Sequence, residues 1–149
     1  MSETTVFIPP ERRPRAGSFI PPLLILPLIG YNFITFLFMG GSAGGWLSKV
    51  FEIPMVSGIT WSLTSGDLML IVGIICLFFE VLKSTNTGRG SVVEHMLSVV
   101  VFVVFLVEFL LVGACANSVF FLLTIMAAFD VVAGFTVSIT GAGRDVTLN

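Results

Sequence analysis

The chain has 149 residues, of which 56% are hydrophobic and 11% are charged, and its formal net charge is −2. The mean hydropathy of +1.06 and the scarcity of charge exclude a soluble globular domain. The sequence contains no basic block, so nucleic acid is not expected as a partner. Several apolar runs are long enough to cross about 30 Å of hydrocarbon. We therefore expect an all-α, four-helix transmembrane bundle over residues 19–142, surrounded by the lipid bilayer.

Positions 1–18 hold polar residues, prolines and three arginines, which is typical of a disordered basic cytoplasmic tail. The apolar run over residues 19–39 is about 21 residues long. A signal peptide is an alternative, because Gly41 and Ala43 form a small-x-small site after the run. The apolar core of a signal peptide usually has about 7–15 residues, so the length favours a retained first span.

The first span carries two breakers and several polar groups. Pro27 and Gly30 predict a kink inside it. Asn32 and Thr35 place polar groups at mid-depth, and the Asn32 amide needs a hydrogen-bond partner there. We expect an interhelical hydrogen bond that fixes packing, worth roughly 0.6 kcal/mol, rather than a ligand contact.

The longest connection, residues 40–66, contains a short apolar segment. Its stretch Trp46–Ile53 places its apolar side chains on one helical face, opposite a serine, a lysine and a glutamate. This pattern predicts a short amphipathic helix that lies in the membrane interface and ends at Pro54. Trp46 and Trp61 are the expected anchors at headgroup depth. A docking surface for another protein is the alternative interpretation.

The second span is expected at residues 65–83. It begins at Thr64, with Asp67 favourably placed near the helix N-terminus. Near its end, Glu80 and Lys83 have the spacing of an ion pair within one helix. A turn-rich loop follows.

The third and fourth spans are expected at residues 92–115 and 118–140, with a short tail at 143–149. A capping box from Ser91 to Glu94 opens the third span, and Asn117 and Ser118 cap the fourth. Of the seven lysines and arginines, six would lie on one side and only Lys49 on the other. The positive-inside rule therefore predicts that both termini are cytoplasmic.

The stretch from Trp61 to Lys83, with the loop and capping box that follow it, resembles small four-span bacterial inner-membrane proteins of unassigned function. The resemblance covers most of the chain after residue 20. It implies a multi-pass protein of the bacterial inner membrane and brings no activity with it.

Two acids, Glu108 and Asp130, lie inside the last two apolar runs. A carboxylate near the bilayer centre costs roughly 2.5–3.5 kcal/mol on insertion scales. Measured from a very short turn near Asn117, they would lie roughly 12 Å and 20 Å deep, offset by about 7 Å. Thr124 or Asn32 could bridge them. No lysine, arginine or histidine is expected at similar depth, so an internal ion pair is not predicted.

Three explanations for the acids stay open: they are protonated, they carry a proton or cation in transport, or they pair with a group on another subunit. We favour a non-enzymatic accessory, assembly or stabilising subunit of a larger membrane complex, in which both acids contact a partner. Other membrane subunits or further copies of the chain are the expected partners. The alternative is a small proton- or cation-coupled transporter or channel that uses the same acids.

Enzymatic, metal and cofactor sites are not predicted. Asp67 follows a glycine, as in half of the intramembrane aspartyl protease motif, but Asp130 would lie too far away in depth to form a catalytic pair with it. The single histidine, His95, cannot supply two axial ligands to a b-type haem, and ligation of a pigment by His95 alone is a minor alternative. Cys76 and Cys115 form no CxxC pattern and are expected to be packing residues.

Overall fold

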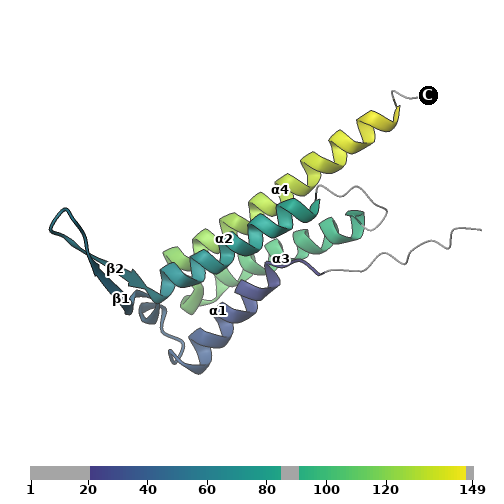
Figure 1. The fold of residues 1–149 in the computed structure, drawn as a ribbon. Helices are drawn as coiled ribbons and strands as arrows, with labels where there is room; N and C mark the ends of the chain where they lie inside the picture. Colours follow the sequence, from purple (N-terminus) through teal and green to yellow (C-terminus); the bar gives the residue numbers. More distant parts are fainter. Residues whose placement is uncertain (1–20, 85–90, 147–149) are drawn as a thin grey trace, which may run out of the picture.

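The computed structural model describes residues 21–84 and 91–146. The expected tail at 1–18 and the loop between the second and third spans lie outside these ranges. Within them the chain forms four α-helices, α1 Ile25–Leu37, α2 Ser65–Ser84, α3 Ser91–Leu111 and α4 Ser118–Val146. Two short 3-10 helices, η1 Ala43–Leu47 and η2 Gly113–Cys115, and two strands, β1 Lys49–Pro54 and β2 Thr60–Thr64, connect them (Figure 1).

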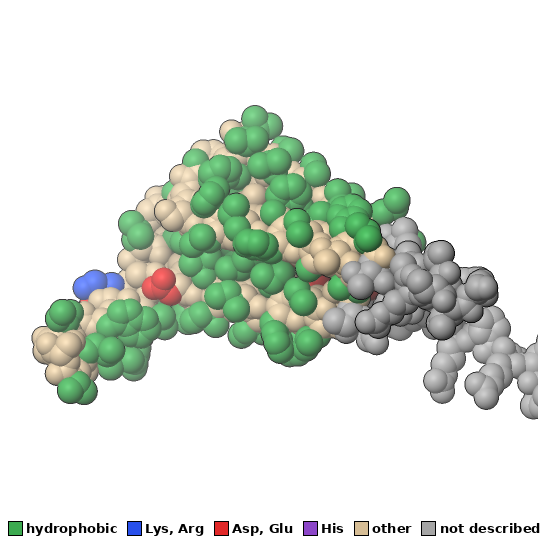
Figure 2. Space-filling model, turned by 90° about the horizontal axis from the view of Figure 1, so that it is seen from above, with side chains coloured by type: hydrophobic (Ala, Val, Ile, Leu, Met, Phe, Trp, Pro, Cys, Tyr) green, Lys and Arg blue, Asp and Glu red, His purple; other side chains and the backbone are tan. Residues whose placement is uncertain are grey.

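Three of the helices, α2, α3 and α4, are long and apolar enough to cross a membrane. The mostly helical fold with four helices is therefore confirmed. The side chains on the outside of the helices are largely hydrophobic (Figure 2). Helix α4 continues to Val146, past the expected end of the fourth span at residue 140 and into the segment expected as a tail.

The first helix is shorter than the predicted span at residues 19–39. Helix α1 has 13 residues, or about 20 Å at 1.5 Å per residue, which is less than the thickness of the hydrocarbon. After it, Gly40 and Gly41 have φ angles of 58° and 77°, a left-handed conformation that favours glycine and stops the helix. Because α1 begins at Ile25, Pro27 occupies its first turn, where a missing N–H breaks no helical hydrogen bond. The expected reason for a kink at Pro27 is therefore absent.

Helix α4 is central, because it packs along both α2 and α3, while α1 lies against α2 and α4 (Figure 1). Glycine permits the close approach of α2 to α4. A Cβ atom built on Gly73 would lie 2.6 Å from Leu123 Cδ2 and 3.0 Å from Met126 Sδ. Small residues at such points let helices in a membrane pack backbone to backbone.

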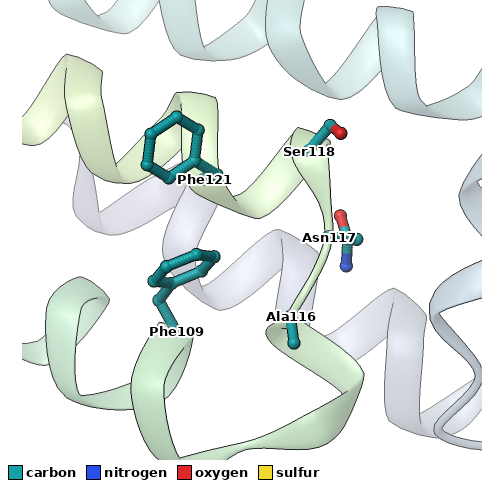
Figure 3. Close-up of a pocket in the computed structure, with 5 residues that line it drawn as sticks. All are labelled: Phe109, Ala116, Asn117, Ser118 and Phe121. Atoms are coloured by element: carbon teal, nitrogen blue, oxygen red, sulfur yellow. The ribbon is translucent and has the colours of Figure 1, made fainter.

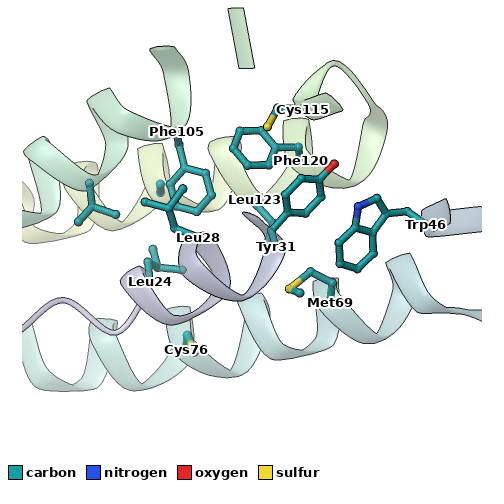
Figure 4. Packing of buried hydrophobic residues seen from close by; sticks show 12 residues of the cluster. Leu24, Leu28, Tyr31, Trp46, Met69, Cys76, Phe105, Cys115, Phe120 and Leu123 are labelled. Carbon is teal, nitrogen blue, oxygen red and sulfur yellow. The ribbon is translucent and has the colours of Figure 1, made fainter. Parts of the chain in front are cut away.

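The buried core lies between the four helices and is aromatic at its centre. Tyr31, Phe105 and Phe120 are fully buried. The Phe120 ring packs in an edge-type arrangement with Tyr31, at a centroid distance of 4.7 Å, and lies 5.4 Å from the Phe105 ring (Figure 4). Cys76 and Cys115 are buried free thiols, as expected for packing residues.

The prediction of an amphipathic helix at residues 46–53 is wrong. Beyond η1 the segment forms β1, which pairs with β2 in an antiparallel hairpin. The residues of β1 explain the difference, because Val50, Phe51 and Ile53 are β-branched or aromatic and favour strands. Gly58 has a φ of 82° in the turn between the strands. Over so few residues, an apolar pattern does not separate a helix from a strand.

Replacing Gly73 with valine tests the close packing of α2 on α4. We expect Gly73→Val to lower the free energy of unfolding by about 1–3 kcal/mol, because the added carbons must displace Leu123 and Met126. Thermal unfolding in detergent measures the effect. Gly113→Val is the control, since nothing lies within 4 Å of a Cβ atom there. An equal loss of stability in both variants would contradict the packing argument.

Candidate functional site

Polar side chains gather at two places in the bundle. We name each group after the acid that it contains. The Glu108 cluster lies near the hairpin and consists of Tyr31, Asn32, Thr35, Trp46, Glu108 and Asn117. The Asp130 cluster lies where α2 ends and α3 begins and consists of Glu80, Lys83, Glu94, His95, Ser98 and Asp130.

In the Glu108 cluster, the acid receives a hydrogen bond from α1. Asn32 Nδ2 donates to Glu108 Oε2 at 2.6 Å and to the Leu28 carbonyl of its own helix at 3.1 Å. The interhelical hydrogen bond expected of Asn32 is thus present, and its partner is Glu108. The acid lies closer to the helix end than predicted, because α3 ends at Leu111 and η2 occupies the connection to α4.

A tyrosine joins this cluster to the connection between α3 and α4. The Tyr31 hydroxyl donates to the Ala114 carbonyl at 2.9 Å, and Asn117 Nδ2 donates to the Tyr31 oxygen at 2.5 Å. Asn117 Oδ1 accepts the backbone N–H groups of Val119 and Phe120, so its predicted capping of the last span is confirmed. Sequence reasoning did not select Tyr31 as a site residue, although it is the only tyrosine in the chain.

The indole of Trp46 is buried, which makes its expected role as an interfacial anchor wrong. Its Nε1 donates to Thr35 Oγ1 at 3.0 Å, and its ring stacks on Tyr31 at 4.6 Å between centroids (Figure 4). The residue is 2% exposed, because η1 turns the indole into the bundle. Trp61 lies on β2 with 48% of its surface exposed, and its headgroup depth stays a prediction.

An open pocket of about 310 Å³ lies beside this cluster, lined by Phe109, Ala116, Asn117, Ser118 and Phe121 (Figure 3). The Phe109 and Phe121 rings lie 5.4 Å apart. The walls of the pocket are mainly apolar, with one amide from Asn117 and one hydroxyl from Ser118. This lining suits an apolar chain or ring better than a charged group.

In the Asp130 cluster, Asp130 is 4% exposed and forms a hydrogen bond with Ser98 of α3. His95 and Lys83 attract its carboxylate, while Glu80 repels it. The prediction that no basic group reaches this depth is therefore wrong. The physical reason is that α3 begins at Ser91 and runs antiparallel to α4, which brings its first turns level with Asp130.

Glu80 connects this cluster to the start of α1. One carboxylate oxygen of Glu80 accepts the Leu23 backbone N–H at 2.7 Å, and the other lies 3.3 Å from Lys83 Nζ, as its spacing predicted. Lys83 Nζ also lies 3.5 Å from Glu94 Oε2. In this cluster three carboxylates face one lysine and one histidine. The His95 ring packs so closely on Gly134 that a Cβ there would overlap it.

The two acids belong to separate networks. Thr124 donates to the Phe120 carbonyl of its own helix at 2.9 Å. Of the two acids, Asn32 bonds only to Glu108. Ser98, beside Asp130, and Glu108 are ten residues apart on α3, or about 15 Å, so the predicted offset of about 7 Å is too small. Neither predicted residue bridges the acids.

The Asp130 cluster can hold a proton, since buried carboxylates with hydroxyl, imidazole and ammonium neighbours form proton relays in membrane proteins. Among the residues that the structure describes, no group of three or more His, Cys, Asp or Glu has a geometry fit for a metal ion.

Comparison with models of protein families, with curated proteins and with solved structures finds no match for the chain. Function must therefore be argued from the sites themselves.

The hydrogen bond between Asn32 and Glu108 can be measured with a double-mutant cycle. We expect Asn32→Ala to lower the free energy of unfolding by about 1–2 kcal/mol, because the Glu108 carboxylate loses its amide donor among apolar helices. In a Glu108→Leu background, Asn32→Ala should lower the free energy of unfolding by less. Unfolding of the four proteins in mixed micelles gives the coupling energy. A coupling of zero would show that the bond does not stabilise the fold.

Proposed function

We propose that this protein is a non-enzymatic integral membrane protein that serves as an accessory, assembly or stabilising subunit of a larger complex in the bacterial inner membrane. The observation that carries the proposal is the edge position of α3. Only 17% of its most apolar window is buried within the chain, against 28% for α2 and 33% for α4. The inner-membrane assignment rests on the resemblance of the Trp61–Lys83 stretch.

The exposed face of α3 has the spacing of a helix-packing surface. Six apolar residues recur at alternating intervals of three and four, and each is between 46% and 67% exposed. Such spacing fits the ridges of one helix into the grooves of another. These residues, named here the α3 stripe, are Val93, Met96, Val100, Val103, Val107 and Leu110.

The two acids differ in how they can serve a partner. Asp130 is buried against Ser98 of its own chain, so a partner reaches it only if the bundle rearranges. Glu108 is half-buried and has one oxygen on Asn32, which leaves its other oxygen for a donor from a neighbour. Glu108 is therefore the better candidate for the polar contact beside the α3 stripe.

The proposed topology places both termini in the cytoplasm. The excess of lysine and arginine on that side supports it. The path of the first segment supports it as well: Leu23 bonds to Glu80 near the end of α2, whereas Tyr31 bonds to Ala114 in the connection between α3 and α4. The segment thus runs between the two ends of the bundle although α1 alone is short.

Co-purification tests the subunit proposal. The protein, tagged at its C-terminus and extracted in mild detergent at native abundance, should elute with another membrane protein in fixed stoichiometry. Val103→Trp, in the α3 stripe, should reduce the amount of partner that co-purifies several-fold, because it disturbs helix packing. Ile74→Trp on α2 is the matched control, because Ile74 is 55% and Val103 47% exposed. A homo-oligomer or a monomer without a partner would contradict the proposal.

The Asp130 cluster favours a second candidate function, proton- or cation-coupled transport. Under this alternative, Asp130→Asn should abolish ion flux into proteoliposomes while the purified protein keeps its oligomeric state. Glu52→Gln, on the hairpin, is the matched acid-to-amide control and should leave flux unchanged. Absence of flux through the unsubstituted protein would exclude this alternative.

A further inference from the structure

The β1–β2 hairpin has two chemically different faces. Its register pairs Phe51 with Leu63 and Ile53 with Trp61. Paired residues point to the same side of a sheet, and every second residue along a strand does so too. These four side chains therefore form one apolar face, which we name the Phe51 face.

The opposite face is polar. Glu52 pairs with Ser62, and Pro54 with Thr60. An irregularity between Lys49 and Phe51 brings the lysine to this side, where Lys49 Nζ donates to Glu52 Oε1 at 2.8 Å. The hydrogen bond and the charge of Lys49 lower the pKa of the Glu52 carboxyl below its usual range. Between residues 49 and 64 these are the only charged side chains, so the hairpin has no net charge.

The Phe51 face is exposed although it is apolar. Phe51 is 57% and Trp61 48% exposed. At the tip, Met55, Val56 and Ile59 are at least half exposed. The hydrophobic side chains of the hairpin continue onto those over the helices (Figure 2). An apolar surface of this kind, with a polar back, fits a boundary between water and lipid.

The base of the hairpin is fixed to the start of α2. The Ser65 N–H donates to the Ser48 carbonyl at 3.0 Å, and a capping box joins Thr64 and Asp67 in both directions. From there the hairpin projects sideways, across the direction of the helices rather than along it (Figure 1). It therefore lies at the level where the apolar surface of α2 begins.

We propose that the hairpin lies in the headgroup region of the bilayer that its own helices cross, with the Phe51 face on the acyl chains and the Lys49–Glu52 pair in water. This inference rests on the membrane embedding proposed above. The depth is limited by the backbone. A two-stranded sheet has a free hydrogen-bonding edge on each strand, and water and headgroups satisfy those edges whereas hydrocarbon does not.

Site-specific fluorescence quenching in the full chain tests the inference. Ile53→Cys, on the Phe51 face, and Thr60→Cys, on the polar face, are each labelled with an environment-sensitive dye in phosphatidylcholine vesicles. Both native cysteines are buried, so the unsubstituted chain gives the labelling blank. We expect nitroxide lipids to quench the dye at position 53 several-fold more than at position 60, and aqueous iodide to show the reverse. If Ile53→Cys does not fold, Phe51→Cys reports on the same face.

Lipid charge provides a second measurement. Because the hairpin has no net charge, replacing part of the phosphatidylcholine with phosphatidylglycerol should leave the quenching by nitroxide lipids at position 53 unchanged. Equal iodide quenching at positions 53 and 60 would overturn the inference by placing the hairpin in water. Protection of both positions from lipid and iodide alike would also overturn it, since a second protein or copy would then cover the hairpin.

A label on α2 separates this inference from the membrane embedding on which it rests. Ile75 is 50% exposed on α2, and a dye at Ile75→Cys should be quenched by nitroxides deep in the acyl chains. Failure of that control would refute the embedding of the helices. Success at position 75 with iodide access at position 53 would refute the hairpin inference alone.

Discussion

Polar groups that lie among apolar helices must find hydrogen-bond partners within the chain, because hydrocarbon offers none. In the described part of the chain, every fully buried side-chain nitrogen and oxygen has a partner. Asn32 donates to one oxygen of Glu108, Ser98 bonds to Asp130, and Trp46 donates to Thr35. These bonds help to determine which helices are neighbours, because apolar packing in lipid does not by itself distinguish one neighbour from another.

This constraint gives α1 a role that its length does not suggest. It has 13 residues, yet the segment leading into it bonds to Glu80, and its own side chains bond to Glu108 and Ala114. It therefore connects the two polar clusters on α2, α3 and α4. Helix α3, in contrast, packs mainly on α4, and its apolar surface is the least covered of the three long helices. This uncovered surface of α3 is the feature on which the proposed subunit role rests.

The parts of the fold that could be predicted are those that depend on local sequence. Long apolar runs identified α2, α3 and α4, and the residues Thr64, Asp67 and Asn117 marked where helices begin because their side chains bond to nearby backbone. Asn32 was considered as a bridge between Glu108 and Asp130, but which of the two it contacts depends on which helix lies beside α1. The end of α3 at Leu111 was not predicted, because the apolar run continues from α3 into η2.

The hairpin and the Asp130 cluster could not be predicted for related reasons. An apolar pattern of eight residues suits a helix or a strand equally, and only the pairing with β2 decides between them. Lys83 and His95 lie at the ends of predicted spans, where sequence reasoning treats charged residues as solvated. The antiparallel packing of α3 on α4 brings the start of α3, with His95, beside Asp130.

The bonds of the first segment also bear on the order in which the protein is assembled. Leu23 bonds to a side chain 57 residues later, and Tyr31 to a carbonyl 83 residues later. During synthesis, neither acceptor exists when α1 leaves the ribosome. Helix α1 can therefore reach its final position only after α3 and its connection to α4 have been made, and until then its polar side chains must be accommodated elsewhere.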